Sequence, residues 1–258
     1  MSANNDTIQK TITVTVLLCL VCAVVVASAA VFLKPLQEKN KLLAKQESIL
    51  KIAAIPFQPE AVSETFQTVT QKVVDLRSGK FTDEVSAASY DQRSAAKDGS
   101  TSIALDGAVD IASIKRRADF ATVYLVENNG QIEKVILPVH GYGLWSTMYG
   151  FLALEGDTRT IVGFGFYDQG ETPGLGGEVD NPKWTGIWPG KKVFDNDFNF
   201  KLQFPKTGAD RNSPDYDHQI DSLAGATLTT RGVENLVKFW LGENGFGQFL
   251  ANLRAGEA

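Results

Sequence analysis

The feature that most constrains this chain is a run of 23 residues without a charge, Thr11 to Leu33, near its N-terminus. At a rise of about 1.5 Å per residue, a helix of that length crosses a bilayer core of about 30 Å. A cleaved signal peptide is the alternative, because three alanines between positions 27 and 30 supply small residues near a cleavage point. The run is long for a signal peptide and ends abruptly at Lys34. We therefore predict a retained transmembrane helix over residues 11–33, preceded by a short tail.

The charges beside this run do not decide which side of the membrane holds the rest of the chain. Only Lys10 precedes the run, whereas four lysines follow it between positions 34 and 45. A plain count of positive charges would place the following domain in the cytoplasm. That rule weakens when a long domain follows, since long domains are translocated largely regardless of charge. From composition alone, the side stays undecided.

Residues 34–58 connect the predicted span to the remainder. Leucines recur there at a spacing of seven, at positions 36, 43 and 50. This pattern predicts a juxtamembrane helix, and a solvated connector with a modest apolar stripe is an equal alternative. Pro56 and Pro59 would end such a helix. Residues 59–258 are then long enough to form one folded domain with its own core.

The middle of this domain carries the pattern of an antiparallel sheet. Residues 121–139 are two apolar runs around an Asn-Gly pair, which is a strong hairpin signal. Residues 151–169 repeat the theme around a Gly-Asp pair, and residues 198–206 predict one further strand. Helical patterns lie before and after these strands. The fold class expected is α+β, with a largely antiparallel sheet flanked by helices.

Several functions are disfavoured by composition and by missing motifs. The 25 basic and 30 acidic residues give a net charge of −5, which argues against a nucleic-acid surface. The sequence has neither a paired-cysteine zinc motif outside the apolar run nor a nucleophile elbow, and its two histidines, His140 and His218, suggest no constellation. Cys19 and Cys22 are interpreted as small apolar packing residues. We therefore assign no catalytic residue and no metal ligand.

The stretch DSLAGATLTTRG, residues 221–232, gathers four hydroxyl residues ahead of an amphipathic helical pattern. Thr229 or Thr230 is a natural N-cap for that helix. The N-terminus of a helix also attracts phosphate, because its N–H groups are unpaired and its dipole favours an anion. Arg231 adds a positive charge nearby. Capping is favoured on spacing alone, with phosphate binding as the second interpretation.

The first seven residues of this stretch, D-x-x-A-G-A-T, resemble the flavinylation signal D-x-x-(S/T)-G-A-(T/S). In proteins with that signal, a flavin transferase esterifies FMN through its phosphate onto the final residue. The resemblance thus implies covalent FMN on Thr227, while Ala224 departs from the pattern. The residues that the transferase would recognise are Asp221, Leu223, Gly225 and Ala226.

Two further stretches resemble parts of the same flavin-binding domain. The run ETPGLGG, residues 171–177, matches its E-T-P-G-L-G signature, and implies that Thr172, Leu175 and Gly176 contact or shield the flavin ring. Within residues 135–151, we expect Leu144, Trp145 and Ser146 to form one wall of the pocket. Lys206 and Arg231 are assigned to phosphate or ring contacts from charge and position only.

Together, these stretches and the N-terminal anchor resemble the C-subunit family of Na⁺-translocating NADH:quinone reductases. That resemblance implies a single-span protein of the bacterial inner membrane with its flavin domain in the periplasm. The chain would relay electrons through FMN between redox centres of neighbouring subunits, with other subunits of that complex, the flavin transferase and membrane lipid as partners, and no nucleic acid. The alternatives are the G subunit of the related Rnf ferredoxin:NAD⁺ reductase and a cofactor-free anchored assembly module.

Overall fold

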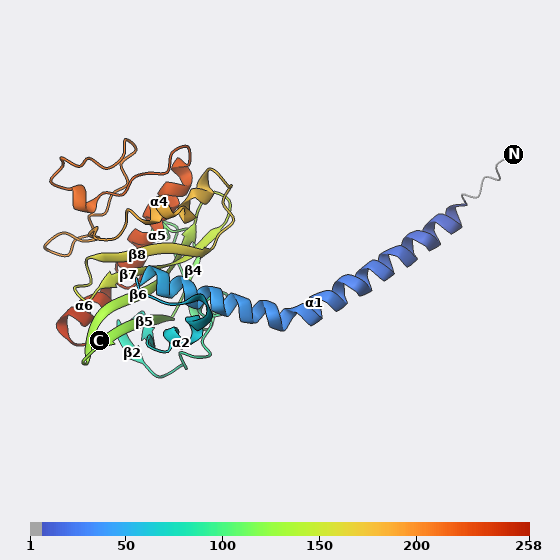
Figure 1. Ribbon diagram of the computed structural model, residues 1–258, viewed down its shortest axis with the longest axis horizontal. Helices are drawn as coiled ribbons and strands as arrows, with labels where there is room; N and C mark the ends of the chain where they lie inside the picture. The colour runs from blue at the N-terminus through green and yellow to red at the C-terminus, as the bar shows by residue number, and fades with distance from the viewer. Residues whose placement is uncertain (1–6) are drawn as a thin grey trace. The chain divides into compact units, whose positions relative to one another are not determined.

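A computed structural model describes residues 7–258 and begins with one long helix, α1 (Ile8–Ile52) (Figure 1). The predicted span and residues 34–52 of the predicted juxtamembrane segment are thus parts of a single helix, with Pro35 inside it, and residues 53–58 follow the helix. The chain divides into two compact units between Ala44 and Lys45, so the end of α1 belongs to the folded domain. Where the membrane begins and ends along α1 stays a prediction.

The part of α1 in the first unit has the properties of a membrane span. It holds an 18-residue window with a mean hydropathy of 3.0 and no buried residue. Apolar side chains such as Val26 and Phe32 are 67% and 83% exposed. In length and composition, the helix can cross a bilayer. Pro35 lacks an N–H and therefore removes one hydrogen bond of this helix.

The second unit is built on a six-stranded antiparallel sheet in the order β2-β1-β5-β6-β7-β8. Its strands are β1 (Thr70–Asp75), β2 (Lys80–Thr82), β5 (Phe120–Asn128), β6 (Gln131–Tyr142), β7 (Thr147–Glu155) and β8 (Ile161–Asp168). Both predicted hairpins are confirmed, as β5–β6 and β7–β8. A short helix, α3 (Gln92–Ala95), and a small second sheet, β3 (Ser102–Ala104) with β4 (Arg116–Ala118), lie between β2 and β5. The predicted α+β class is confirmed.

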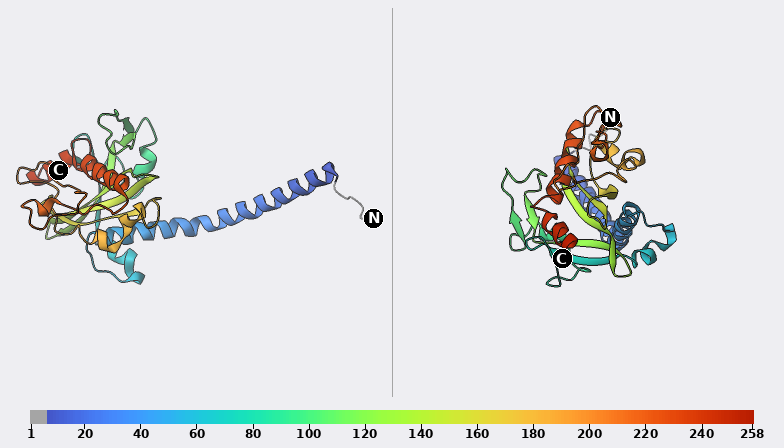
Figure 2. Two further views of the ribbon diagram at one scale, coloured as in Figure 1. Left: turned by 90° about the horizontal axis from the view of Figure 1, so that it is seen from above. Right: turned by 90° about the vertical axis from the view of Figure 1, so that its left-hand side faces the viewer.

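Both faces of the large sheet are covered. On one face lie α5 (Thr227–Leu241) and α6 (Gly247–Ala255), drawn in red in Figure 2, and the Trp240 indole N–H donates to the His140 carbonyl at 2.7 Å. On the other face, the end of α1 and α2 (Val62–Phe66) bury Ile49, Leu50 and Phe66. Because side chains alternate along each strand, both faces of the central strands are apolar.

The end of α1 packs closely on the sheet at a glycine of β8. A Cβ on Gly163 of β8 would overlap the backbone carbonyl of Ile52, so only glycine allows this approach. The Lys134 ammonium adds a hydrogen bond of 2.8 Å to the Ala53 carbonyl. These contacts hold the last turn of α1 against the domain.

The strand predicted over residues 198–206 is wrong. Leu202 and Phe204 are buried there, but the segment forms only isolated bridges. The physical reason lies at the edge of the sheet. Residues 190–193 already pair with the start of β8, through Gly190 N–H to the Ile161 carbonyl at 2.8 Å. Residues 198–206 therefore pack apolar side chains without a strand edge to join.

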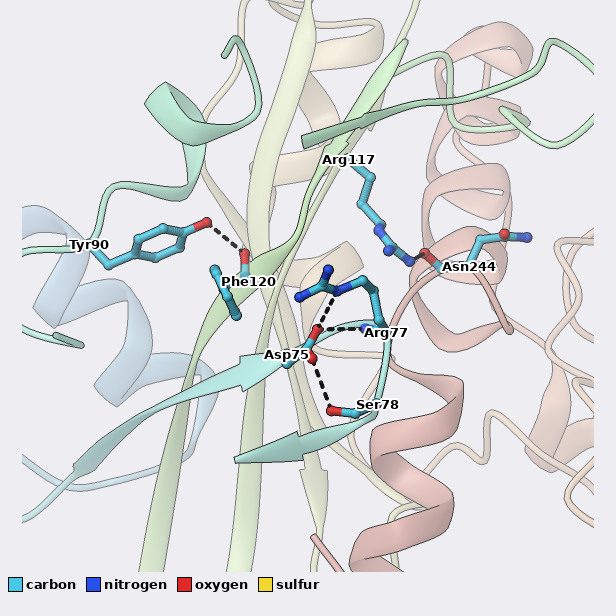
Figure 3. A network of polar contacts seen from close by, with 7 residues as sticks. All are labelled: Asp75, Arg77, Ser78, Tyr90, Arg117, Phe120 and Asn244. Carbon is cyan, nitrogen blue, oxygen red and sulfur yellow. Dashed lines mark hydrogen bonds and ion pairs between the residues drawn. The ribbon is translucent and has the colours of Figure 1, made fainter. Parts of the chain in front are cut away.

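Figure 3 shows separate groups of polar contacts, among them one in the turn after β1 and one between β4 and the loop after α5. The Asp75 carboxylate accepts from the Arg77 backbone at 2.9 Å and from Ser78 at 3.2 Å, which closes the β1–β2 turn. Arg117 of β4 is only 5% exposed and donates to the Asn244 carbonyl at 2.7 Å. Burial lowers the pKa of Arg117 from its ordinary value, and it remains a cation at neutral pH. The small sheet is thereby fixed to the end of α5.

Candidate functional site

Helix α5 begins at Thr227, so the prediction that Thr229 or Thr230 is its N-cap is wrong. The N-cap is Ala226, with no side-chain capping bond. The Thr230 hydroxyl donates to the Ala226 carbonyl at 3.1 Å and accepts the Leu223 N–H at 3.1 Å. Both threonines lie within the first turn, and their hydroxyls bind other groups.

The start of α5 is open to an anion. The N–H groups of Thr227, Leu228 and Thr229 have no acceptor inside the helix, and among residues 7–258 no side chain caps the helix at Ala226. Thr227 and Arg231, one turn apart on the helix, are both exposed. Unpaired N–H groups and the positive end of the helix dipole suit a phosphate next to Thr227.

The turn that leads into α5 is fixed by polar contacts and by a glycine. Asp221 accepts the Ala209 N–H on its carboxylate at 2.6 Å and the Trp184 indole N–H on its carbonyl at 2.8 Å. Gly225 has a φ of +73°, which favours glycine. A Cβ there would lie 3.5 Å from Leu175 Cδ2, so the ETPGLGG loop lies directly on this turn.

A buried carboxylate, Glu171, joins all three stretches singled out from the sequence. It accepts the backbone N–H groups of Leu144, Trp145 and Ser146 at 3.1, 2.9 and 3.2 Å. Its other oxygen accepts the Thr229 hydroxyl at 2.7 Å. This role was not predicted from the sequence, although the residue stands in the ETPGLGG run. The signal was the acidic residue within a motif otherwise made of small residues.

The charge of Glu171 is stabilised by its partners. Burial raises the pKa of this carboxyl, but the hydrogen bonds from Trp145, Thr229, Leu144 and Ser146 outweigh burial and lower it below its ordinary value. Glu171 is thus ionised at neutral pH. The carboxylate fixes the position of the loop 143–146 relative to the first turn of α5.

We expect Gly176→Ala to destabilise this arrangement by about 2 kcal/mol. A Cβ at Gly176 would lie 2.5 Å from Thr229 Oγ1 and 2.8 Å from Glu171 Oε2, so the pair would have to separate. Chemical unfolding of the full chain in detergent measures the effect. Gly107→Ala is the matched control, because a Cβ there meets no atom within 4 Å. Equal stability of the two variants would contradict the prediction.

Four large apolar side chains near the start of α5 are exposed. Leu144, Trp145, Leu175 and Leu228 are 40%, 67%, 48% and 54% exposed, respectively. Leu228 follows Thr227, Leu175 lies on the turn at Gly225, and the other two belong to the loop held by Glu171. An apolar group of this kind beside an anion site suits a ligand with a flat apolar ring and a phosphate.

Of the remaining predicted residues, Thr172 and Ser146 belong to the loops of the site, whereas Lys206 is not bonded to them. The Thr172 side chain is exposed, and its carbonyl accepts the N–H groups of Leu175 and Gly177 at 3.1 and 2.9 Å. Ser146 accepts the Gly170 N–H on its hydroxyl at 2.7 Å and therefore links two loops of the site. Lys206 is exposed and makes no hydrogen bond or ion pair within the described part of the chain that would connect it to these residues.

His140 lies away from this group, between Tyr149 and Trp240. Burial, and then the charge of Arg93, lowers the pKa of His140 to about 4. In the unfolded chain the imidazole takes a proton near pH 6.5. The stability due to His140 is therefore complete above pH 6.5 and is lost as pH falls towards 4.

We expect His140→Gln to flatten the acid side of the stability profile. Between pH 6.5 and 4 the wild type should lose up to about 3 kcal/mol through this group, and the variant should not. Thermal unfolding midpoints measured at steps of pH compare the two slopes. Parallel slopes across that window would show that the imidazole does not titrate as described.

Comparison with known proteins agrees with this geometry. A family model described as an FMN-binding domain matches residues 143–242, which include the loop 143–146, the ETPGLGG run and α5. The class of protein that the fold and the site define is therefore an FMN-binding flavoprotein.

Full-length relatives identify the family. The chain is 54% identical over 260 residues to the C subunit of the Na(+)-translocating NADH-quinone reductase of Pseudomonas aeruginosa, covering 99% of this chain and 100% of that one. It is 47% identical to the same subunit of Vibrio alginolyticus, covering 100% and 99%. The chain belongs to the family of C subunits of Na⁺-translocating NADH-quinone reductases. The Rnf subunit and the cofactor-free module are not retained as alternatives.

Solved structures show the same fold. The crystal structure of Shewanella oneidensis NqrC is 36% identical, with a TM-score of 0.75, and the match covers 81% of this chain and 96% of that chain. The corresponding subunit from Parabacteroides distasonis is 26% identical, with a TM-score of 0.65 and coverage of 84% and 96%. The chain is thus an FMN-containing electron-transfer subunit of a membrane oxidoreductase complex, whose other subunits are its partners. Its apolar N-terminal helix fits a single-pass anchor.

Proposed function

We propose that Thr227 carries FMN through a phosphoester bond, and that the chain relays electrons between redox centres of neighbouring subunits on the path from NADH to quinone. The observation that carries this proposal is the position of Thr227. Thr227 is exposed at the uncapped N-terminus of α5 and is the last residue of the stretch that resembles the flavinylation signal. The first-turn N–H groups and Arg231 would hold the phosphate.

The ring system would lie against the exposed apolar side chains described above. Leu144 and Trp145 are held in place by Glu171, and Leu175 lies beside Gly225. Thr172 and Gly176 belong to the same loop and would contact or shield the ring. When bound, FMN supplies the electron-transfer chemistry, and the protein supplies position and electrostatics. No acid or base from this chain is assigned to the reaction.

Attachment requires a flavin transferase that reads the exposed signal. Asp221, Ala224, Gly225 and Thr227 are all exposed, so an enzyme can reach the stretch. In the step proposed, the Thr227 oxygen forms a bond to the FMN phosphorus. The bond between phosphorus and one phosphate hydroxyl group breaks, and this hydroxyl leaves with the Thr227 proton, so the added mass equals FMN less one water. Lys206 is proposed only as a cation near the loop that Asp221 holds.

The intact mass of the full chain, produced together with its flavin transferase, tests the linkage. We expect a single addition of FMN less one water, flavin fluorescence on a denaturing gel, and a modified peptide that contains Thr227. A chain of unmodified mass, made beside a transferase shown to modify another substrate, would overturn the proposal.

We also propose that residues 59–258 form a domain on the periplasmic side of the inner membrane, with residues 11–33 in contact with lipid. The family resemblance supports this side, against the count of lysines. The test replaces Cys19 and Cys22 by Ser and introduces Lys183→Cys, at an exposed position of the domain. A membrane-impermeant maleimide should label this chain in intact spheroplasts and should not label the control Lys10→Cys. The reverse pattern would place the domain in the cytoplasm.

A further inference from the structure

A second concave site is lined by residues outside the candidate flavin site. It is a cavity of about 250 Å³. One wall comes from α3 and the residues after it, a second from residues 113–116, and a third from the facing ends of β6 and β7. Segments far apart in the chain therefore meet around it, and neither the signal sequence nor the ETPGLGG run contributes a residue.

The lining of this cavity is strongly basic. Arg93, Lys97, Lys115 and Arg116 all line it, and no aspartate or glutamate of the described residues does. Arg93 has an ion-pair partner outside the lining, Asp168, whereas the other three cations have none among the described residues, so these three repel one another and attract an anion. The remaining polar groups of the lining include the hydroxyls of Ser113, Thr147 and Tyr149, which can donate hydrogen bonds.

The two arginines are held by the protein. Arg93 pairs with Asp168 at 2.7 Å and stacks on the Tyr149 ring with its guanidinium carbon 3.4 Å from the centroid. Arg116 donates to the hydroxyl and the carbonyl of Ser102 at 2.9 and 2.7 Å. Each guanidinium has five N–H donors, and these bonds use only part of them.

The two lysines have no such partner. Lys97 and Lys115 are exposed, and neither forms an ion pair with a residue between positions 7 and 258. Lys115 has a φ of +65°, which is unfavourable for a lysine. Its backbone is kept there by Asp110, which accepts the Lys115 N–H at 2.7 Å. The fold thus places a strained lysine at the rim of a basic cavity.

We propose that this cavity binds a phosphate group. Cations reach it from two separate segments and hydroxyls from a third, which suits an oxyanion with oxygens on several sides. The volume admits a phosphate or a small phosphomonoester and is below the usual range for larger ligands. The phosphate can come from a soluble ion or from a phospholipid headgroup. The proposal does not depend on the linkage of FMN to Thr227.

The test measures the acetylation of individual lysines by mass spectrometry, using the full chain. One arm uses the protein in a non-ionic detergent with sodium phosphate or with sodium chloride at equal ionic strength. The other uses nanodiscs of phosphatidylcholine with or without phosphatidic acid. We expect acetylation of Lys97 and Lys115 to fall several-fold with phosphate in at least one arm. Lys183 and Lys238 are exposed elsewhere and should be unaffected.

The pattern of protection identifies the source. Protection by sodium phosphate indicates a soluble ligand, and protection only by phosphatidic acid indicates a headgroup. If phosphate leaves the acetylation of Lys97 and Lys115 unchanged in both arms, the proposal is overturned. Protection by sodium acetate equal to that by phosphate would overturn it as well. Isothermal titration calorimetry should show that a double variant, Lys97→Gln with Lys115→Gln, binds the protecting phosphate about tenfold or more weakly, with Lys183→Gln plus Lys238→Gln as the control. Unchanged affinity in the double variant would also overturn it.

Discussion

A chain in which Thr227 is replaced by Ala is expected to fold like the wild type and to carry no covalent FMN. The Thr227 side chain is exposed and makes no hydrogen bond within residues 7–258, so its removal should change stability by no more than about 0.5 kcal/mol. Alanine is also a good residue for the first turn of a helix. Intact mass and fluorescence on a denaturing gel should show complete loss of the flavin.

Two variants make this result specific. Thr227→Ser keeps a hydroxyl that the signal pattern accepts, and we expect it to retain the flavin. Thr172→Ala removes another exposed hydroxyl of the site and should remain covalently labelled. A fluorescent band in Thr227→Ala would assign the attachment to another residue. Loss of the label in Thr172→Ala as well would point to a general failure of maturation.

Replacement of Glu171 should have the largest effect on the stability of the site. In Glu171→Ala, the N–H groups of Leu144, Trp145 and Ser146 and the Thr229 hydroxyl all lose their acceptor. A buried donor left without a partner costs about 1–3 kcal/mol, so we expect a loss of about 3 kcal/mol or more. Glu171→Gln keeps one acceptor oxygen and should lose less. Chemical unfolding of the full chain measures both.

The effect of Glu171→Gln should depend on pH. The pKa of Glu171 is lowered in the fold, so its contribution is complete above the ordinary value of 4.5 and is lost as pH falls through the lowered value. Wild type and Glu171→Gln should therefore converge in stability in acid. Glu243→Gln, at an exposed site, is the control and should match the wild type. A difference that persists unchanged in acid would contradict the role of the charge.

The parts of the fold predicted correctly from the sequence depend on local patterns. An Asn-Gly pair between two apolar runs suffices for the β5–β6 hairpin, because the turn and the strands are neighbours in the chain. The same holds for the apolar face of α5. Residues 198–206 have the pattern of a strand, but pairing depends on a free edge of the sheet, and the preceding residues 190–193 already occupy that edge.

The contacts within the site could not be predicted from local sequence patterns either. Thr229 and Thr230 are plausible N-caps by position, yet their hydroxyls bind Glu171 and Ala226 in the folded chain. The role of Glu171 depends on contacts across 25 to 58 residues of sequence, which no periodicity reveals. The basic cavity joins α3, β4 and the β6–β7 hairpin, so its lysines carry no signal in sequence order.

Because the apolar residues beside Thr227 are exposed, the affinity of this surface for the flavin ring need not be high. Leu144, Trp145, Leu175 and Leu228 keep 40% to 67% of their surface accessible, so they form an open apolar surface beside Thr227. A phosphoester bond would keep the flavin at this surface without a high binding affinity, since a covalently linked group has an effective concentration in the millimolar range or above. The ring could then rest on a shallow surface and keep one edge free, so that redox partners reach it without opening the protein.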